Sequence, residues 1–317
     1  MTDLSVEIAG IRFDSYIFNA SGPRCTTIDE LITLGESDSG AIMTQSCTVE
    51  SITGDSESRY IALPHGSVHS MGPSNLGFQA YVDMVPILKQ QKKTLVISIS
   101  GLSLEDDIAM VDAFMMTNAD LIEISFCNSN IVGKPQLGYD FEQADKALGA
   151  LTHLGDTPIG IKLPFYFDQS HFDTMAEIIA THPVSFITFN SSLSDALVID
   201  SENESSMVKA QNRIEDKDGA DVMGGLSGSY IKPLGLANVF NFKKRLPEHI
   251  KVIGVGGINS GIDAFEYALA GADAVQVATC FQKEGNQCFT RLAKELEQVL
   301  AQKGYTNITD VIGKLKT

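Results

Sequence analysis

Residues 252–279 read VIGVGGINSGIDAFEYALAGADAVQVAT, and their pattern is that of one strand–loop–helix–strand unit. The apolar runs 252–254 and 274–277 have the length of buried strands. Between them, after a glycine-rich loop, residues 261–270 place apolar side chains at helical spacing. Because two strands joined by a helix lie parallel in one sheet, this stretch predicts a βαβ unit.

The same alternation extends from this unit along the rest of the chain. Eight apolar runs with helical patterns between them predict an α/β fold whose parallel sheet closes into a (βα)8 TIM barrel; an open, doubly wound sheet is the alternative. The expected strands are 16–20, 41–44, 95–98, 121–124, 159–162, 186–189, 252–254 and 274–277. The expected helices are 27–34, 104–116, 141–154, 168–181, 234–246, 261–270 and 287–302.

Three further segments complete the expected architecture. The segments Leu4–Ile8 and Ile11–Phe13, which flank Ala9-Gly10, predict a small β-hairpin that closes the bottom of the barrel. The connections 45–94 and 191–251 are long and follow strands, so they are expected to rise over the C-terminal face as lids or substrate walls. Without an internal repeat or a linker, residues 1–317 are expected to form a single domain.

Composition excludes several classes of partner. The 23 basic and 40 acidic residues give a net charge of −17, which argues against binding to nucleic acid or to anionic membranes. The N-terminus shows no basic leader with an apolar stretch, and no apolar run reaches the roughly 18 residues that span a bilayer. The five scattered cysteines lack a C-x-x-C pair, which favours reduced thiols in the cytoplasm over disulfides or a metal site.

The loop after residue 254 is a candidate phosphate site. Gly256 and Gly257 let backbone N–H groups approach an anion closely, and the following helix adds positive charge at its N-terminus. Ala278 and Thr279 follow the eighth expected strand, and barrels often bind phosphate at the loops after strands seven and eight. Glycines also serve ordinary tight turns, so a bare turn is the alternative.

Short segments that run in order along the whole chain match one family. They are Asn19-Ala20-Ser21-Gly22, Ser70-Met71-Gly72, Asn75-Leu76-Gly77-Phe78, Gly133-Lys134-Pro135-Gln136, Ile161-Lys162-Leu163-Pro164, Tyr230-Ile231-Lys232-Pro233, Gly256-Gly257-Ile258, Asp263-Ala264-Phe265-Glu266 and Gly313-Lys314-Leu315-Lys316. On these residues the chain resembles the class 1A (soluble, fumarate-type) dihydroorotate dehydrogenases.

This resemblance implies an FMN-dependent, dimeric, cytosolic barrel. Its members oxidise dihydroorotate to orotate in pyrimidine biosynthesis and pass the electrons to fumarate. Lys162 would lie by the pyrimidine edge of the flavin, where a fixed ammonium favours the reduced state. The other implied flavin contacts are Ala20, Ser21, Gln45 and Ser46 around the ring, and Ser227, Gly228, Gly256, Gly257, Ala278 and Thr279 at the phosphate.

The segment after the fourth expected strand departs from the family. The family's base is the cysteine of an N-x-S-C-P-N segment, and an ungapped alignment places Asn128 there, although an asparagine amide cannot accept a proton at neutral pH. Ser125 replaces the first asparagine, and Cys127 lies one residue early. Either Cys127 or Ser129 takes the role after a one-residue shift, or the segment holds no competent base.

The expected substrate pocket has changed as well. Gln45 replaces a lysine that reaches both flavin and orotate in the family. The family's N-S-M-G-L becomes His69-Ser70-Met71-Gly72-Pro73, in which a protonated His69 would restore positive charge. Three functions stay open: an authentic dihydroorotate dehydrogenase, a paralogous FMN oxidoreductase for another small planar substrate, and an FMN-binding protein without fast catalysis. The pocket positions that match the family are Asn130, Asn190 and Ser191.

Overall fold

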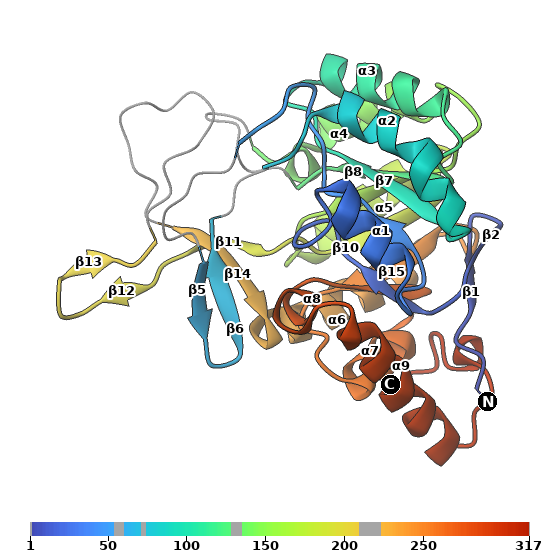
Figure 1. Ribbon diagram of the computed structural model, residues 1–317, viewed down its shortest axis with the longest axis vertical. Helices are drawn as coiled ribbons and strands as arrows, with labels where there is room; N and C mark the ends of the chain where they lie inside the picture. Colours follow the sequence, from blue (N-terminus) through green and yellow to red (C-terminus); the bar gives the residue numbers. More distant parts are fainter. Residues whose placement is uncertain (1, 54–59, 71–73, 128–134, 209–222, 317) are drawn as a thin grey trace.

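Eight parallel strands form the centre of the fold in the computed structural model, which describes residues 2–53, 60–70, 74–127, 135–208 and 223–316 (Figure 1). Their order around the sheet is β3-β16-β15-β10-β9-β8-β7-β4, and every neighbouring pair is parallel. The strands are β3 (Ile17–Asn19), β4 (Ile42–Met43), β7 (Leu95–Ile99), β8 (Leu121–Ser125), β9 (Ile159–Leu163), β10 (Phe186–Phe189), β15 (Lys251–Val255) and β16 (Ala274–Val277). The predicted barrel and its eight strands are confirmed.

The seam between β3 and β4 is joined by a side chain. The amide of Asn19 donates to the Met43 carbonyl at 2.8 Å and accepts from the Met43 N–H at 2.9 Å. Asn19 is fully buried, so both bonds are shielded from water. Below them the Gly40 N–H donates to the Ile17 carbonyl at 2.8 Å. These bonds hold the two end strands together and nearly close the barrel.

Helices cover the outside of the barrel. Five of them begin at a Ser, Thr or Asp whose side chain caps the first turn, as at Thr27, which forms a capping box with Glu30. The helices are α1 (Ile28–Gly35), α2 (Phe78–Leu88), α3 (Leu104–Met115), α4 (Phe141–Leu151), α5 (Gln169–Thr181), α6 (Lys232–Lys243), α7 (Gly261–Ala270), α8 (Thr279–Glu284) and α9 (Gln287–Gln302). All seven expected helices are present, and α2 and α8 are additional. Within the described ranges, no helix is both long and apolar enough to cross a bilayer.

The N-terminal hairpin is present as predicted. Its strands β1 (Val6–Ile8) and β2 (Ile11–Phe13) pair antiparallel around Ala9 and Gly10, which both have positive φ. The Thr94 hydroxyl, directly before β7, donates to the Arg12 carbonyl at 2.7 Å. The hairpin therefore lies at the end of the barrel where the strands begin.

The two long connections meet in a second, antiparallel sheet that the sequence did not predict. Its order is β11-β14-β6-β5, so it combines strands from both connections, and it lies to one side of the barrel (Figure 1). The pairing of β6 with β14 joins segments more than 150 residues apart. A hairpin of β12 (Ile199–Asp200) and β13 (Ser205–Ser206) extends beyond this sheet. The strands of the sheet are β5 (Tyr60–Leu63), β6 (Gly66–His69), β11 (Leu193–Ala196) and β14 (Gly224–Gly228).

One buried acid gives the fold a testable pH dependence. Burial raises the pKa of Asp107, in the first turn of α3, to about 7, although its carboxylate accepts the Gly101 N–H at 2.7 Å. The folded protein therefore holds this proton more tightly than the unfolded chain, where the pKa is about 3.9. The stabilisation from Asp107 is complete below about pH 4 and is lost as the pH rises to 7.

We expect the unfolding free energy of the unmutated protein, relative to that of Asp107→Asn, to fall by about 1 kcal/mol per pH unit across this window. Urea unfolding of both proteins at pH 4.5 to 8 measures this difference. Parallel pH profiles would contradict it.

Candidate active site

The carboxyl ends of the parallel strands bring several predicted residues together. Ala20 directly follows β3, and its N–H donates to the carbonyl of Val277 at the end of β16. Beside it the Ser21 and Ser46 hydroxyls lie 2.7 Å apart, and Ser46 lies 2.8 Å from the Ser98 hydroxyl of β7. This row of hydroxyl groups links the ends of β3, β4 and β7 and forms a polar edge there.

Lys162 is buried near the end of β9, with 7% of its surface exposed. Its ammonium Nζ lies 3.9 Å from the Oε1 atom of Glu123, a wholly buried acid in the middle of β8. The other oxygen, Oε2, accepts the Thr188 hydroxyl at 2.6 Å and the Gln276 amide at 2.9 Å. Sequence reasoning missed Glu123; a charged residue within an otherwise apolar strand was the signal that could have found it.

Asn190, directly after β10, is 2% exposed. Neither its amide nitrogen nor its amide oxygen has a hydrogen-bond partner among the described residues. Gln45 shows a similar feature, because its Nε2 donates to the Ser74 carbonyl at 3.3 Å while its buried Oε1 has no partner in this part of the chain. Since unpaired buried polar atoms are costly, these two side chains are suited to bind a polar ligand. Ser191, which follows Asn190, is half-buried.

His69 lies at the end of β6 and contacts β14. Its Nε2 atom lies 3.0 Å from the Ser227 hydroxyl. Burial lowers the pKa of His69, which favours the neutral imidazole. A neutral imidazole would not supply the positive charge lost at Gln45, and that role of His69 stays a prediction. The ring is half-buried and lies beside Ser227 of β14.

The predicted phosphate residues converge through tight backbone contacts. Gly228, Gly256 and Gly257 all have positive φ. A Cβ atom on Gly257 would lie 2.9 Å from the Gly228 carbonyl oxygen, and one on Gly228 would lie 2.4 Å from the Cα of Gly66. The loops after β14 and β15 are thus in contact only because glycine occupies these positions.

The N-terminus of α8 adds further donors beside these loops. Ala278 precedes the helix without capping it by a side chain, and Thr279 is its first residue. The first N–H groups of a helix have no partner within the helix, and they attract anions. Because β16 pairs with β15, these donors lie next to the Gly256-Gly257 loop.

The expected base segment is described only in part. The Ser125 hydroxyl lies 3.4 Å from the Cys127 thiol, which is partly exposed. The other four cysteines are buried and unpaired; burial raises the pKa of Cys25 to about 12. The remaining predicted residues that lie outside the described residues are Met71, Gly72, Pro73, Asn128, Ser129 and Asn130.

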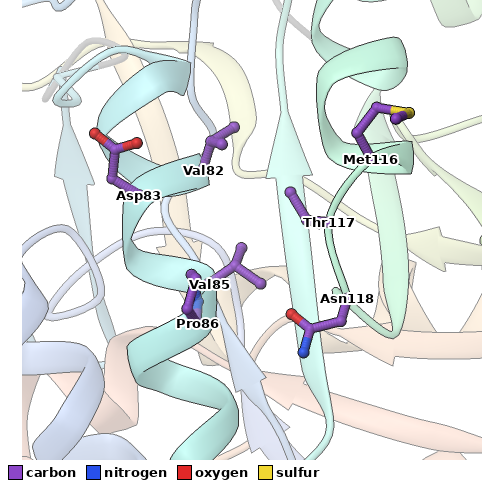
Figure 2. A pocket seen from close by; sticks show the side chains of 7 residues that line it. All are labelled: Val82, Asp83, Val85, Pro86, Met116, Thr117 and Asn118. Atoms are coloured by element: carbon purple, nitrogen blue, oxygen red, sulfur yellow. The ribbon is translucent and has the colours of Figure 1, made fainter.

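A separate groove lies on the outside of the barrel. Figure 2 shows its lining, in which Val82 and Val85 of α2 point toward the side of Met116 and Asn118. Residues 116–118 lead into the beginning of β8, whereas Ser125 and Cys127 lie at its opposite end. The groove therefore lies at the end of the barrel opposite Ser125 and Cys127. Across the described ranges, no group of three or more His, Cys, Asp or Glu side chains is placed to hold a metal ion.

Comparison with known proteins identifies the family. The dihydroorotate dehydrogenase family model matches residues 3–300. The chain is 42% identical over 320 residues to dihydroorotate dehydrogenase A (fumarate) of Lactococcus lactis, and 40% identical over 318 residues to a putative dihydroorotate dehydrogenase A (fumarate) of Streptococcus agalactiae; each match covers 99% of both chains.

A crystal structure of DHODH from Eimeria tenella in complex with ferulenol has the same fold. Its TM-score is 0.77 at 19% identity, and the match covers 98% of this chain and 88% of that one. The family match, the full-length relatives and the barrel agree: this chain is an oxidoreductase that belongs to the dihydroorotate dehydrogenase family.

Proposed function

We propose that this protein is an FMN-dependent dihydroorotate dehydrogenase that oxidises dihydroorotate to orotate and passes the electrons to fumarate. The names of its full-length relatives support both the reaction and the acceptor. The observation that carries the proposal is the buried Lys162 ammonium near the carboxyl end of β9. The Asn190 amide, at the end of the neighbouring strand β10, has no hydrogen-bond partner among the described residues. We further propose that it is a cytoplasmic homodimer in pyrimidine biosynthesis and that residues 1–317 form one domain.

The described residues fit FMN. The loop glycines let the backbones of neighbouring segments pack closely. Their N–H groups, together with Ser227, Ala278 and Thr279, would hold the phosphate. Ala20, Ser21, Gln45 and Ser46 would border the ring. When bound, FMN would supply the hydride acceptor. Lys162 would hold a positive charge at the ring edge, where negative charge develops on reduction.

Substrate contacts are proposed for the buried polar atoms that lack a hydrogen-bond partner among the described residues. The amides of Asn190 and Gln45 would orient the planar ring of the substrate, with His69, Ser125 and Ser191 around them. Asn130 and the segment Met71–Pro73 complete the proposed set. The proton at C5 of dihydroorotate requires a base on the face opposite the flavin, and we assign that role to segment 127–129, through Cys127 or Ser129.

Separate replacement of Cys127 and Ser129 by alanine identifies the base. We expect one of the two variants to reduce its flavin with dihydroorotate about 10²–10⁴-fold more slowly, because a positioned base is lost, while the other stays near the unmutated rate. Single-turnover stopped-flow measurements give these rates, and dithionite reduction controls for an intact flavin. Unchanged rates in both variants would exclude the segment as the source of the base.

The proposed function is tested by anaerobic titration of the purified protein with dihydroorotate, following the loss of the oxidised-flavin absorbance. Rapid bleaching supports the assigned reaction. A flavin that dithionite reduces but dihydroorotate does not would instead favour a paralogous oxidoreductase. This is the second candidate function because Gln45 replaces a lysine of the family. A colourless protein that does not take up added FMN would remove the flavin assignment. Light scattering during gel filtration tests the dimer.

A further inference from the structure

We propose that Glu123 is a positioning residue: its buried carboxylate holds the Lys162 ammonium at the mouth of the barrel and thereby sets how strongly the site favours reduced flavin. The inference rests on the proposed function, because it assumes that Lys162 lies at the edge of a bound flavin. It concerns a residue of the barrel interior that the proposed set of cofactor and substrate contacts does not include.

The side chain of Glu123 crosses the interior of the barrel. β8 carries Glu123, while its partners Thr188 and Gln276 lie on β10 and β16. In the order of the sheet, β16 is four strands away from β8, so it lies on the opposite side of the barrel. Two donors from different strands bind the single atom Oε2, at 2.6 and 2.9 Å. The orientation of the carboxylate is therefore fixed by the barrel itself.

The second oxygen is directed by this arrangement toward Lys162. Oε1 is buried and has no hydrogen-bond partner in the described part of the chain, and the Lys162 Nζ atom is 3.9 Å away. The Lys162 side chain is 9% exposed and that of Glu123 is fully buried, so water screens the pair weakly. A buried carboxylate is costly unless an opposite charge compensates it. A carboxylate that served only to fill the interior would not need one oxygen left free beside a lysine.

In this geometry the Lys162 ammonium can interact with both the Glu123 carboxylate and a bound flavin ring. With oxidised, uncharged flavin in the site, Glu123 compensates the ammonium. When reduction adds negative charge to the ring, the ring and Glu123 compete for the same positive charge. Removing the charge of Glu123 leaves the ammonium uncompensated until the flavin is reduced. The reduced state is then favoured, and the reduction potential becomes more positive.

The first test measures the reduction potential of bound FMN in Glu123→Gln, Lys162→Met and the double variant. We expect Glu123→Gln to raise the ratio of reduced to oxidised flavin at a fixed potential at least tenfold, which is about 30 mV for two electrons. We expect less than a threefold effect when Lys162 is already Met, because Glu123 acts through that residue. Asp273→Asn is the matched control, because Asp273 is a buried acid that forms an ion pair with Lys243 at the opposite end of the barrel; it should leave the ratio within twofold.

The inference would be overturned if Glu123→Gln changed the flavin ratio equally in the protein with Lys162 and in the Lys162→Met variant. It would also be overturned if Glu123→Gln left the ratio unchanged. If Glu123→Gln does not fold, Thr188→Val provides a second route, since it removes one donor that fixes the carboxylate and keeps its charge. The freed carboxylate should bind Lys162 more strongly and shift the potential in the negative direction. An unchanged potential in this variant would also overturn the inference.

The second test does not depend on flavin. In FMN-free protein, each single replacement leaves one buried charge unpaired, whereas the double variant removes both. If the two replacements acted independently, their fold-changes in the unfolding equilibrium constant would multiply in the double variant. We expect the measured constant of the double variant to be at least tenfold smaller than that product. An unfolding equilibrium constant of the double variant equal to that product would overturn the pairing of Glu123 with Lys162, whether or not FMN binds. Failure to bind FMN with the coupling intact would instead count against the proposed function.

Discussion

Replacing Lys162 by glutamine is expected to slow flavin reduction by dihydroorotate about 10²–10³-fold, the typical cost of removing a fixed group that stabilises charge in a transition state. The reason is that Lys162 is held, buried, at the carboxyl end of β9, where its ammonium would face the reduced ring. The glutamine amide keeps much of the side chain's size but not its charge. Single-turnover stopped flow under anaerobic conditions measures the rate.

The same replacement should also destabilise the protein. It leaves the buried Glu123 carboxylate without the cation that lies 3.9 Å from it, and breaking a buried ion pair costs about 3–5 kcal/mol. Lys89→Gln is a suitable control, because Lys89 forms an ion pair with Asp120 at 2.6 Å away from the barrel mouth. That variant should reduce its flavin at the unmutated rate. A Lys162→Gln protein that also does so would refute the assigned role.

Replacing Gly228 by alanine is expected to abolish stable FMN binding. The position has φ of +86° and ψ of −157°, a conformation that costs a residue with a Cβ atom about 1–3 kcal/mol. The added Cβ would also lie 2.4 Å from the Gly66 Cα and 2.7 Å from the His65 carbonyl oxygen. Because both contacts are with backbone atoms, β6 and β14 must separate, and the proposed phosphate loop moves with them. Fluorescence titration of the apoprotein with FMN measures the loss, which we expect to exceed tenfold in Kd.

Gly304→Ala is the matched control for this change. Gly304 has a similar φ of +79°, but a Cβ atom there would meet nothing within 4 Å. This variant also places a Cβ atom at positive φ, but without the contacts at the proposed site, so it should bind FMN as tightly as the unmutated protein. If both alanine variants bind FMN alike, Gly228 does not shape the phosphate site.

The barrel was predictable because its signals are local. Each strand is a short apolar run, and five helices begin at a Ser, Thr or Asp that caps them. Helix α2 was missed because these signals are absent: it begins after Gly77, without a side-chain cap, and contains Pro86. Helix α8 is only six residues long and likewise has no side-chain cap.

The second sheet could not be predicted in the same way. Its strands are short and contain polar residues and glycine, as in Gly224–Gly228, and they pair with segments far away in the chain. Register and partner in such strands depend on what they pack against, because no alternation of apolar and polar residues specifies them. In this sheet His69 lies beside Ser227 of β14, and burial lowers its pKa, an effect that its local sequence does not show.

The sequence by itself determined the α/β barrel, the hairpin at its base and the resemblance to one family, because helix caps, apolar periodicity and short motifs act between neighbouring residues. Only the tertiary structure decided which polar atoms meet inside the barrel. Glu123, Lys162, Thr188 and Gln276 come from four strands spread over more than 150 residues. Closing the sheet brings them together, and their burial makes each unpaired charge or amide costly.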